Sequence, residues 1–190
     1  VCSSLTDDFA DIRVEDVDLP EPGFGEVRIR IRATSLNFPD ILLCQGKYQL
    51  KLEPPFTPGM DIAGEIDAVG EGVERFFVGE AVVGGLRFGG LAEYAVVSTE
   101  GLQKKPDHLS FAEAAAYQVA YLTAYVALVR RGNLQAGETL LVHGASGGVG
   151  MAAVDVGKLL GATVIATGGS DAKLQRVLRY GADHVINNKQ

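Results

Sequence analysis

The chain has 190 residues, of which 47% are hydrophobic, and its 17 basic and 24 acidic residues give a net charge of -7. This composition allows a sizeable buried core and excludes a disordered chain, while the lack of any long basic cluster argues against a nucleic-acid-binding surface. The two cysteines are too few for a disulfide framework, and the three histidines stand too far apart in the sequence to suggest a metal centre. No basic, apolar targeting segment is present at Val1, so we expect a cytoplasmic protein.

The first part of the chain is predicted to form β-strands joined by tight turns. Val27, Ile29 and Ile31 alternate with arginines, which is the period-two pattern of a half-buried strand. Glycine-rich turns separate further short apolar runs, at 62–69, 81–83 and 91–97. We therefore expect residues 1–109 to form a small, barrel-like β domain.

A capping box marks the start of a helical region. In Ser110-x-x-Glu113 the hydroxyl and the carboxylate each satisfy a free amide at a helix N-terminus. The alanine-rich sequence that follows predicts two helices with a break between them, ending near Gly132. Its uncharged stretch, 114–129, falls short of the about 20 residues that a membrane span needs. It therefore predicts a buried helix and no membrane span.

Strands and helices alternate from Gly137 onward. The pattern predicts strand 139–143, helix 149–160, strand 162–167, helix 171–180 and a last strand from His184. Such alternation specifies a parallel sheet with right-handed crossovers, so the fold class is α/β. We assign residues 110–190 to linking helices and the first part of a nucleotide-binding domain. Because a complete domain of this type has about six strands, we expect the fold to continue beyond Gln190 and this piece alone to be inactive.

A glycine loop, residues 143–150 with the sequence HGASGGVG, joins the first strand of this region to its helix. Glycine permits a positive φ in the turn, lets the backbone approach a pyrophosphate and lets the helix pack closely on the strand. The helix N-terminus adds free amides and the positive end of a dipole. We predict that a dinucleotide binds here, at Gly144, Gly147, Gly148, Val149 and Gly150; the alternative is a tight turn that binds nothing.

The end of the second strand indicates which dinucleotide is bound. NAD-specific folds usually carry an acidic residue there for the ribose 2′-hydroxyl, whereas this strand ends in Gly168-Gly169-Ser170. Ser170 and Lys173 are suited to a 2′-phosphate, so the sequence favours NADPH (NADP+) over NADH. Asp171, directly after Ser170, is an acidic residue close to this position, so NADH remains an alternative cofactor. In the other alternative, Ser170 merely caps the helix and Lys173 is a solvated surface charge.

Several segments in a fixed order carry a family resemblance. They are the glycine loop and the sequences SLNFPD at 35–40, QGKY at 45–48, PGMDIAG at 58–64 and AYLTAY at 120–125. Together they resemble the zinc-free medium-chain dehydrogenase/reductase superfamily, in its quinone oxidoreductase (zeta-crystallin-like) branch. The resemblance implies a GroES-like β-barrel-type N-terminal domain, a Rossmann domain, a cofactor cleft between them and a homodimer of the full-length protein.

The resemblance also bears on the acceptor. Zinc-dependent relatives carry a cysteine near the position of Pro39 and a His-Glu pair where this chain has Met60-Asp61. Without a Lewis acid to polarise an alcohol or aldehyde oxygen, simple alcohol oxidation is disfavoured. We therefore expect hydride transfer to a small electron-poor acceptor, a quinone or an α,β-unsaturated carbonyl compound.

By resemblance, Asn37, Phe38 and Asp40 line the nicotinamide side of the cleft, and Thr123 lies near the cofactor from the opposite wall. Tyr48 matches a tyrosine regarded in enoyl-thioester reductases as proton donor or positioner. We name Tyr48, Asn37 and Thr123 as candidate catalytic residues and Phe38 and Asp40 as cofactor-binding ones. The alternatives are that Tyr48 packs at the cleft rim and that Asn37 forms a turn.

Two other functions remain open on the sequence. An enoyl-thioester reductase of fatty-acid or polyketide synthesis would share these motifs. A non-catalytic nucleotide-binding protein with a structural or regulatory role, as some relatives are, would bind the cofactor without turnover.

Overall fold

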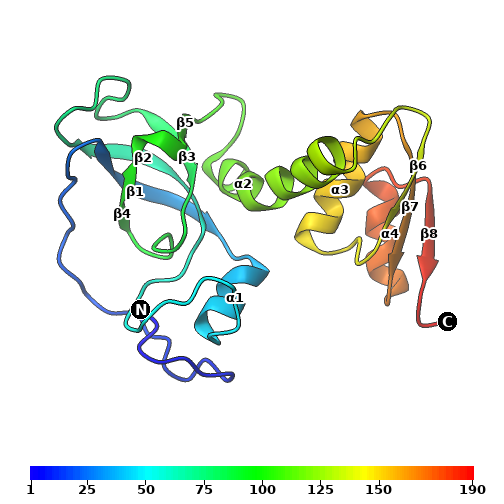
Figure 1. Cartoon of the computed structure of the whole chain (residues 1–190), viewed down its shortest axis with the longest axis horizontal. Coiled ribbons are helices and arrows are strands. Elements are labelled where there is room, and N and C mark those ends of the chain that lie inside the picture. The colour runs from blue at the N-terminus through cyan, green and yellow to red at the C-terminus, as the bar shows by residue number, and fades with distance from the viewer. The chain divides into compact units, whose positions relative to one another are not determined.

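The alternating segment near the N-terminus forms the longest strand of an antiparallel sheet. The computed structural model describes residues 1–190, and in it β1 (Glu26–Ser35) lies between β4 and β2 in the strand order β4-β1-β2-β3-β5 (Figure 1). The other strands are β2 (Asp61–Val69), β3 (Ala81–Gly85), β4 (Tyr94–Ser98) and β5 (Leu102–Lys104). The predicted β domain is confirmed, and β4 and β5 are the first and last strands in the order of its sheet.

The two faces of β1 follow its sequence pattern. Val27 and Ile29 are fully buried and pack with Ile62, Ile66 and Val82 in the core of this unit. Register pairs Ile29 with Ile66 across β2, so apolar side chains from neighbouring strands meet on one face. The intervening arginines lie on the other face, where Arg28 and Arg32 meet acidic side chains.

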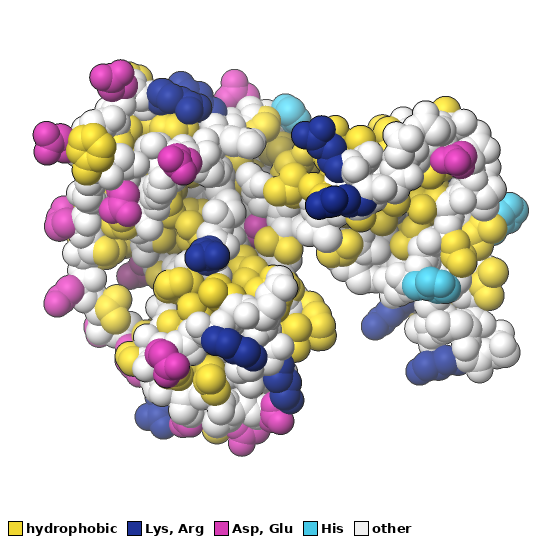
Figure 2. All heavy atoms as spheres, in the orientation of Figure 1, with side chains coloured by type: hydrophobic (Ala, Val, Ile, Leu, Met, Phe, Trp, Pro, Cys, Tyr) yellow, Lys and Arg dark blue, Asp and Glu magenta, His cyan; other side chains and the backbone are white.

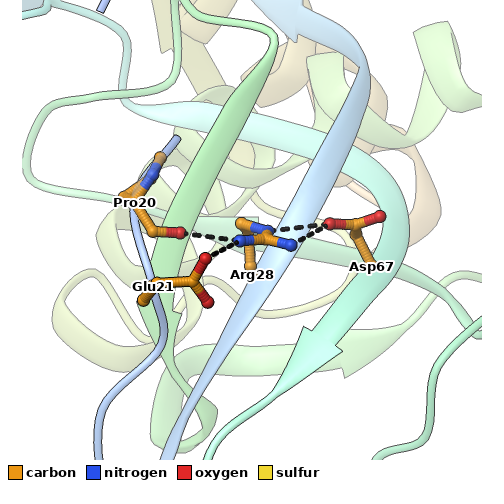
Figure 3. Close-up of polar contacts among 4 residues, drawn as sticks. All are labelled: Pro20, Glu21, Arg28 and Asp67. Atoms are coloured by element: carbon orange, nitrogen blue, oxygen red, sulfur yellow. Dashed lines mark hydrogen bonds and ion pairs between the residues drawn. The ribbon is translucent and has the colours of Figure 1, made fainter. Parts of the chain in front are cut away.

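Arg28 fastens the extended segment before β1 to the sheet. Its Nε donates to Asp67 Oδ2 at 2.7 Å, and its Nη1 donates to Pro20 O at 3.1 Å and Glu21 Oε1 at 3.0 Å (Figure 3). The Arg28 side chain is 11% exposed and Asp67 is 34% exposed, so solvent screens this pair less than the pair with Glu21, which is 79% exposed. The Arg28 guanidinium thus holds the segment around Pro20 and Glu21, which pairs with no strand, against β1 and β2 of the sheet.

A parallel sheet forms in the second half, in the order β6-β7-β8. Its strands are β6 (Thr139–Val142), β7 (Thr163–Gly168) and β8 (His184–Asn187), and its crossovers are α3 (Gly148–Leu159) and α4 (Asp171–Arg179). Val164, Val154 and Val177 are fully buried where the helices pack on the strands. Both helices cover the same face of the sheet (Figure 1). On the strands, Leu141 and Ile186 are each 52% exposed. The predicted α/β class is confirmed.

The helical region between the sheets begins as predicted. The Ser110 amide donates to Glu113 Oε2 at 2.8 Å and the Glu113 amide donates to Ser110 Oγ at 3.2 Å, which is the expected capping box. The predicted break is wrong, because α2 (Phe111–Tyr125) runs directly into a π-helical turn, η2 (Val126–Arg131). Burial is also less complete than predicted: Ala114, Ala115, Ala120 and Ala124 are buried, while Leu122 and Tyr125 are about half exposed.

The chain forms two compact units, Val1–Gln118 and Val119–Gln190, so the boundary between them falls inside α2. The sequence motifs predict a domain boundary at 109/110. None of the helices combines the length and the apolar character that crossing a bilayer requires. On the face of the first unit in Figure 2, acidic and basic side chains are dispersed among neutral and apolar ones.

Candidate functional site

The glycine loop makes a tight turn between β6 and α3. Gly144 has a φ of +61, and the Gly147 amide donates to Gly144 O at 3.0 Å. A Cβ on Gly150 would lie 2.5 Å from Gly144 O and 2.7 Å from Ala145 Cα, both of them backbone atoms. The two glycines are therefore required for different reasons. Gly144 permits the left-handed backbone of the turn, and Gly150 lets α3 pack closely against that turn.

The N-terminus of α3 presents backbone amides to solvent. Gly148, Val149 and Gly150 form its first turn, where N–H groups have no acceptor within the helix. A Cβ on Gly148 would meet nothing within 4 Å, so the surface in front of this turn is open. Free amides, the helix dipole and close access to backbone fit the pyrophosphate of a dinucleotide.

A small hollow lies in the same unit. It has a volume of about 120 Å³ and is lined by Ser146, Met151, Lys173 and Arg176; we call it the Lys173 hollow. Lys173 and Arg176 are exposed, stand one turn apart on α4 and make no ion pair in the chain. The lining therefore joins two cations and a hydroxyl, and no acidic side chain offsets them.

Ser170 and Asp171, which open the turn before Lys173, do not point to a role in phosphate binding or in NADH selection. Ser170 is the N-cap residue of α4, but its side chain makes no capping hydrogen bond and does not line the Lys173 hollow. The Asp171 carboxylate accepts from Asn187 Nδ2 at 2.7 Å and from Gln190 Nε2 at 3.1 Å. Asp171, the acidic residue that left NADH as an alternative cofactor, is thus hydrogen-bonded to residues at and after the end of β8.

Two other polar residues of this unit, the predicted Thr123 and His143, do not line the Lys173 hollow. Thr123 is exposed on α2. His143, the first residue of the glycine loop, has its Nδ1 at 3.0 Å from Thr167 Oγ1, and Thr167 is buried. His143 therefore links the ends of β6 and β7.

In the first unit, Asp40 holds the start of a short helix, α1 (Phe38–Cys44). Its Oδ2 accepts from the Asn37 amide at 2.8 Å and its Oδ1 accepts from the Gly59 amide at 3.0 Å. Burial raises the pKa of Asp40 above the usual range of aspartate, although the two amide hydrogen bonds oppose that shift. Asp40 thereby ties α1 to the loop that leads into β2.

Asn37 belongs to a hydrogen-bonded group that sequence reasoning missed. Asn37 Nδ2 donates to Ser35 Oγ and to Asp61 Oδ2, each at 2.9 Å, and Ser35 Oγ donates to the same Asp61 oxygen at 2.6 Å. Asp61 is 0% exposed. An aspartate opening an apolar strand was the available signal, because a buried carboxylate requires donors nearby. Phe38, next to this group, is 68% exposed.

Tyr48 borders a larger hollow of about 530 Å³, lined by Tyr48, Gln49, Leu50, Met60, Leu86 and Arg87; we call it the Tyr48 hollow. Tyr48 is half-buried, and its amide donates to Leu42 O at 3.1 Å. Its hydroxyl has no hydrogen-bond partner in the chain, so it is available to a bound molecule.

The cysteines and the acidic residues form no reactive or metal-binding cluster. Both cysteines are buried, and burial raises the pKa of Cys44 to about 11, so the thiol is protonated at neutral pH. No group of three or more histidine, cysteine, aspartate or glutamate side chains has an arrangement that could hold a metal ion.

Comparison with known families agrees with this geometry. Residues 23–107 match the alcohol dehydrogenase GroES-like domain and residues 148–190 match the zinc-binding dehydrogenase domain. The chain belongs to the medium-chain dehydrogenase/reductase superfamily.

Quinone oxidoreductases are among the similar members of the superfamily. The human quinone oxidoreductase is 38% identical over 176 residues, which are 92% of this chain and 54% of that protein. The quinone oxidoreductase of Thermus thermophilus, solved also in complex with NADPH, is 39% identical with a TM-score of 0.80, covering 91% of this chain and 55% of that one. The CurK enoyl reductase is 33% identical with a TM-score of 0.88, covering 99% of this chain and 58% of that one. The chain thus spans about half the length of the curated relatives it matches.

Proposed function

We propose that the full-length protein is an NADPH-dependent reductase that delivers hydride to a quinone or an α,β-unsaturated carbonyl compound without zinc. The observation that carries the proposal is the Lys173 hollow beside the glycine loop, because its two unpaired cations suit a 2′-phosphate. The quinone oxidoreductase relatives, one of them solved with NADPH, support the choice of reaction.

The residues divide into cofactor-binding and acceptor-binding sets. When bound, NADPH supplies the hydride. The amides of Gly148, Val149 and Gly150 hold the pyrophosphate, and Lys173 holds the 2′-phosphate together with Arg176. In the first unit, Asn37 and Phe38 orient the nicotinamide, with Asp40 fixing the turn that carries them. We assign Thr123 to orientation as well, on the family resemblance alone.

Tyr48 completes the proposed acceptor site. Its free hydroxyl polarises the acceptor carbonyl or delivers a proton as the hydride arrives, which requires an oxygen-to-oxygen distance of about 2.6 to 3.2 Å. An enoyl-thioester reductase is the second candidate, favoured by the likeness to the CurK enoyl reductase. A turnover screen of the full-length protein with NADPH against quinones, enones and enoyl thioesters decides between them. Cofactor binding with no turnover on the whole panel would indicate a non-catalytic relative.

The first prediction concerns zinc. Because Met60 replaces one ligand of the zinc-dependent members and Asp61 is committed to Ser35 and Asn37, the full-length protein should contain no bound zinc. Elemental analysis of protein purified without chelators measures this directly. One zinc ion per chain would contradict the prediction.

The second prediction concerns cofactor choice. Lys173→Ala should weaken NADPH binding by about ten- to a hundredfold, because a charge-assisted hydrogen bond to the 2′-phosphate is worth roughly 1.5 to 3 kcal/mol. NADH lacks that phosphate, so its affinity should change by only a few-fold. Calorimetric titration of the full-length protein with both cofactors gives the comparison.

Arg179→Ala is the matched control, since Arg179 is an exposed cation on α4 that does not line the Lys173 hollow. It should alter neither affinity appreciably. Equal losses for NADPH and NADH in Lys173→Ala, or equal effects of the two variants, would refute the phosphate assignment.

A further inference from the structure

The Tyr48 hollow contains a single charged side chain, Arg87. Acidic residues outnumber basic ones in the chain, yet none lines this hollow. Arg87 is exposed on the loop after β3 and makes no ion pair, whereas Arg28 and Arg32 on the sheet are each paired with acidic side chains. The guanidinium therefore keeps all its donors for a molecule that enters the hollow.

The position of Arg87 is fixed by its neighbour in sequence. The Leu86 amide donates to Met60 O at 2.6 Å, and the Leu86 side chain packs against the core of the unit. Met60, which faces the same hollow, is buried. The loop that carries Arg87 is thus anchored on both its backbone and its side chain, directly beside the hollow.

The lining combines an apolar floor with polar groups of three kinds. Leu50, Met60 and Leu86 supply apolar surface suited to a ring or an alkyl chain, and Tyr48 and Gln49 supply a hydroxyl and an amide. Arg87 adds a planar fork of donors that matches a carboxylate, sulfonate or phosphate in two parallel hydrogen bonds. A neutral acceptor would use the floor and the hydroxyl but leave this charge without a partner.

We propose that Arg87 selects acceptors that carry an anionic group: the apolar part lies on Leu50, Met60 and Leu86, and the anion pairs with the guanidinium. This inference rests on the proposed reductase function and adds a substrate class to it. The lone cation also concentrates anionic molecules at the mouth of the hollow, an effect that weakens as salt is added.

The test compares an uncharged naphthoquinone with naphthoquinone sulfonate in the full-length protein supplied with NADPH. Arg87→Ala should lower kcat/KM for the sulfonate by about tenfold, mostly through KM, since the ion pair that it removes is exposed and solvent partly screens it. For the uncharged quinone the loss should stay within about threefold. Arg87→Lys, which keeps the charge and loses the fork, should fall between wild type and Arg87→Ala.

Arg75→Ala is the control, because Arg75 is an exposed cation of the same unit that lies over Phe76 and does not line the Tyr48 hollow. It should leave the ratio of the two quinones unchanged. Equal losses on both quinones in Arg87→Ala, or a ratio shifted equally by Arg75→Ala, would overturn the proposal.

A binding measurement separates this inference from the proposed function. Naphthalene sulfonate cannot accept hydride, so its calorimetric affinity is independent of turnover. Binding to wild type that falls about tenfold in Arg87→Ala supports the anion site even if no quinone or enone is reduced. That absence of turnover would refute the reductase function and not the anion site. No binding to wild type, or unchanged affinity in Arg87→Ala, refutes the anion site even if quinones are reduced.

Discussion

Tyr48→Phe should reduce turnover of enone substrates by about 10²- to 10⁴-fold in the full-length protein, the range that general acid catalysis supplies. The change keeps the ring and removes a hydroxyl that has no partner in the chain. Folding should therefore be unaffected, and NADPH affinity should remain close to that of wild type. Steady-state kinetics with an enone, a calorimetric titration with NADPH and a thermal melt measure these three properties.

Quinones provide the internal control for Tyr48. A quinone stabilises the anion that forms when it accepts hydride, so water can protonate that anion afterwards. Turnover of quinones should therefore fall less than turnover of enones when the Tyr48 hydroxyl is removed. A large loss for enones with a small one for quinones supports proton donation. If both substrate classes stay within a few-fold of wild type, Tyr48 is part of the wall and the proton comes from elsewhere.

Gly150→Ala should lower both the stability of the nucleotide-binding unit and its affinity for NADPH. The new Cβ would lie 2.5 Å from one backbone atom and 2.7 Å from another, and backbone cannot move aside as a flexible side chain does. Overpacking of this kind costs about 1 to 3 kcal/mol, and any shift of α3 also displaces the amides proposed to hold the pyrophosphate. A thermal melt and a calorimetric titration of the full-length variant test both effects.

Gly148→Ala separates packing from binding. A Cβ there meets nothing within 4 Å, and alanine is the better helix former, so stability should be equal or slightly higher. NADPH affinity should nevertheless fall, because the methyl group occupies the space that the pyrophosphate needs. Unchanged NADPH affinity in Gly148→Ala would place the pyrophosphate elsewhere, and an unchanged melting temperature in Gly150→Ala would contradict the packing argument.

Segments with a regular apolar pattern were predictable, and short elements without one were not. The alternation in β1 and the strand-helix pattern after Gly137 predicted these elements to within a few residues, because each buries one face and its period is visible in the chain. The seven-residue α1 was missed, since Asn37-x-x-Asp40 indicates a turn as readily as a helix start. The three-residue β5 carries too few residues to show a period.

The candidate site was predictable only where one segment supplies it. The glycine loop is contiguous, so its geometry followed from its sequence. The Lys173 hollow required Ser146 and Met151 from one crossover and Lys173 and Arg176 from the next, a grouping that only folding creates. Asp61 likewise reaches Asn37 through strand pairing, because β2 places it opposite Ser35. The spacing of residues along the chain does not predict which of them come together in this way.

The parallel sheet has a consequence for how these residues behave in solution. Leu141 and Ile186 project apolar surface from its strands, and β6 and β8 leave their outer backbone groups unpaired. Open edges beside apolar side chains favour strand addition and aggregation. We therefore expect this unit to associate through this face and these edges wherever they are left uncovered.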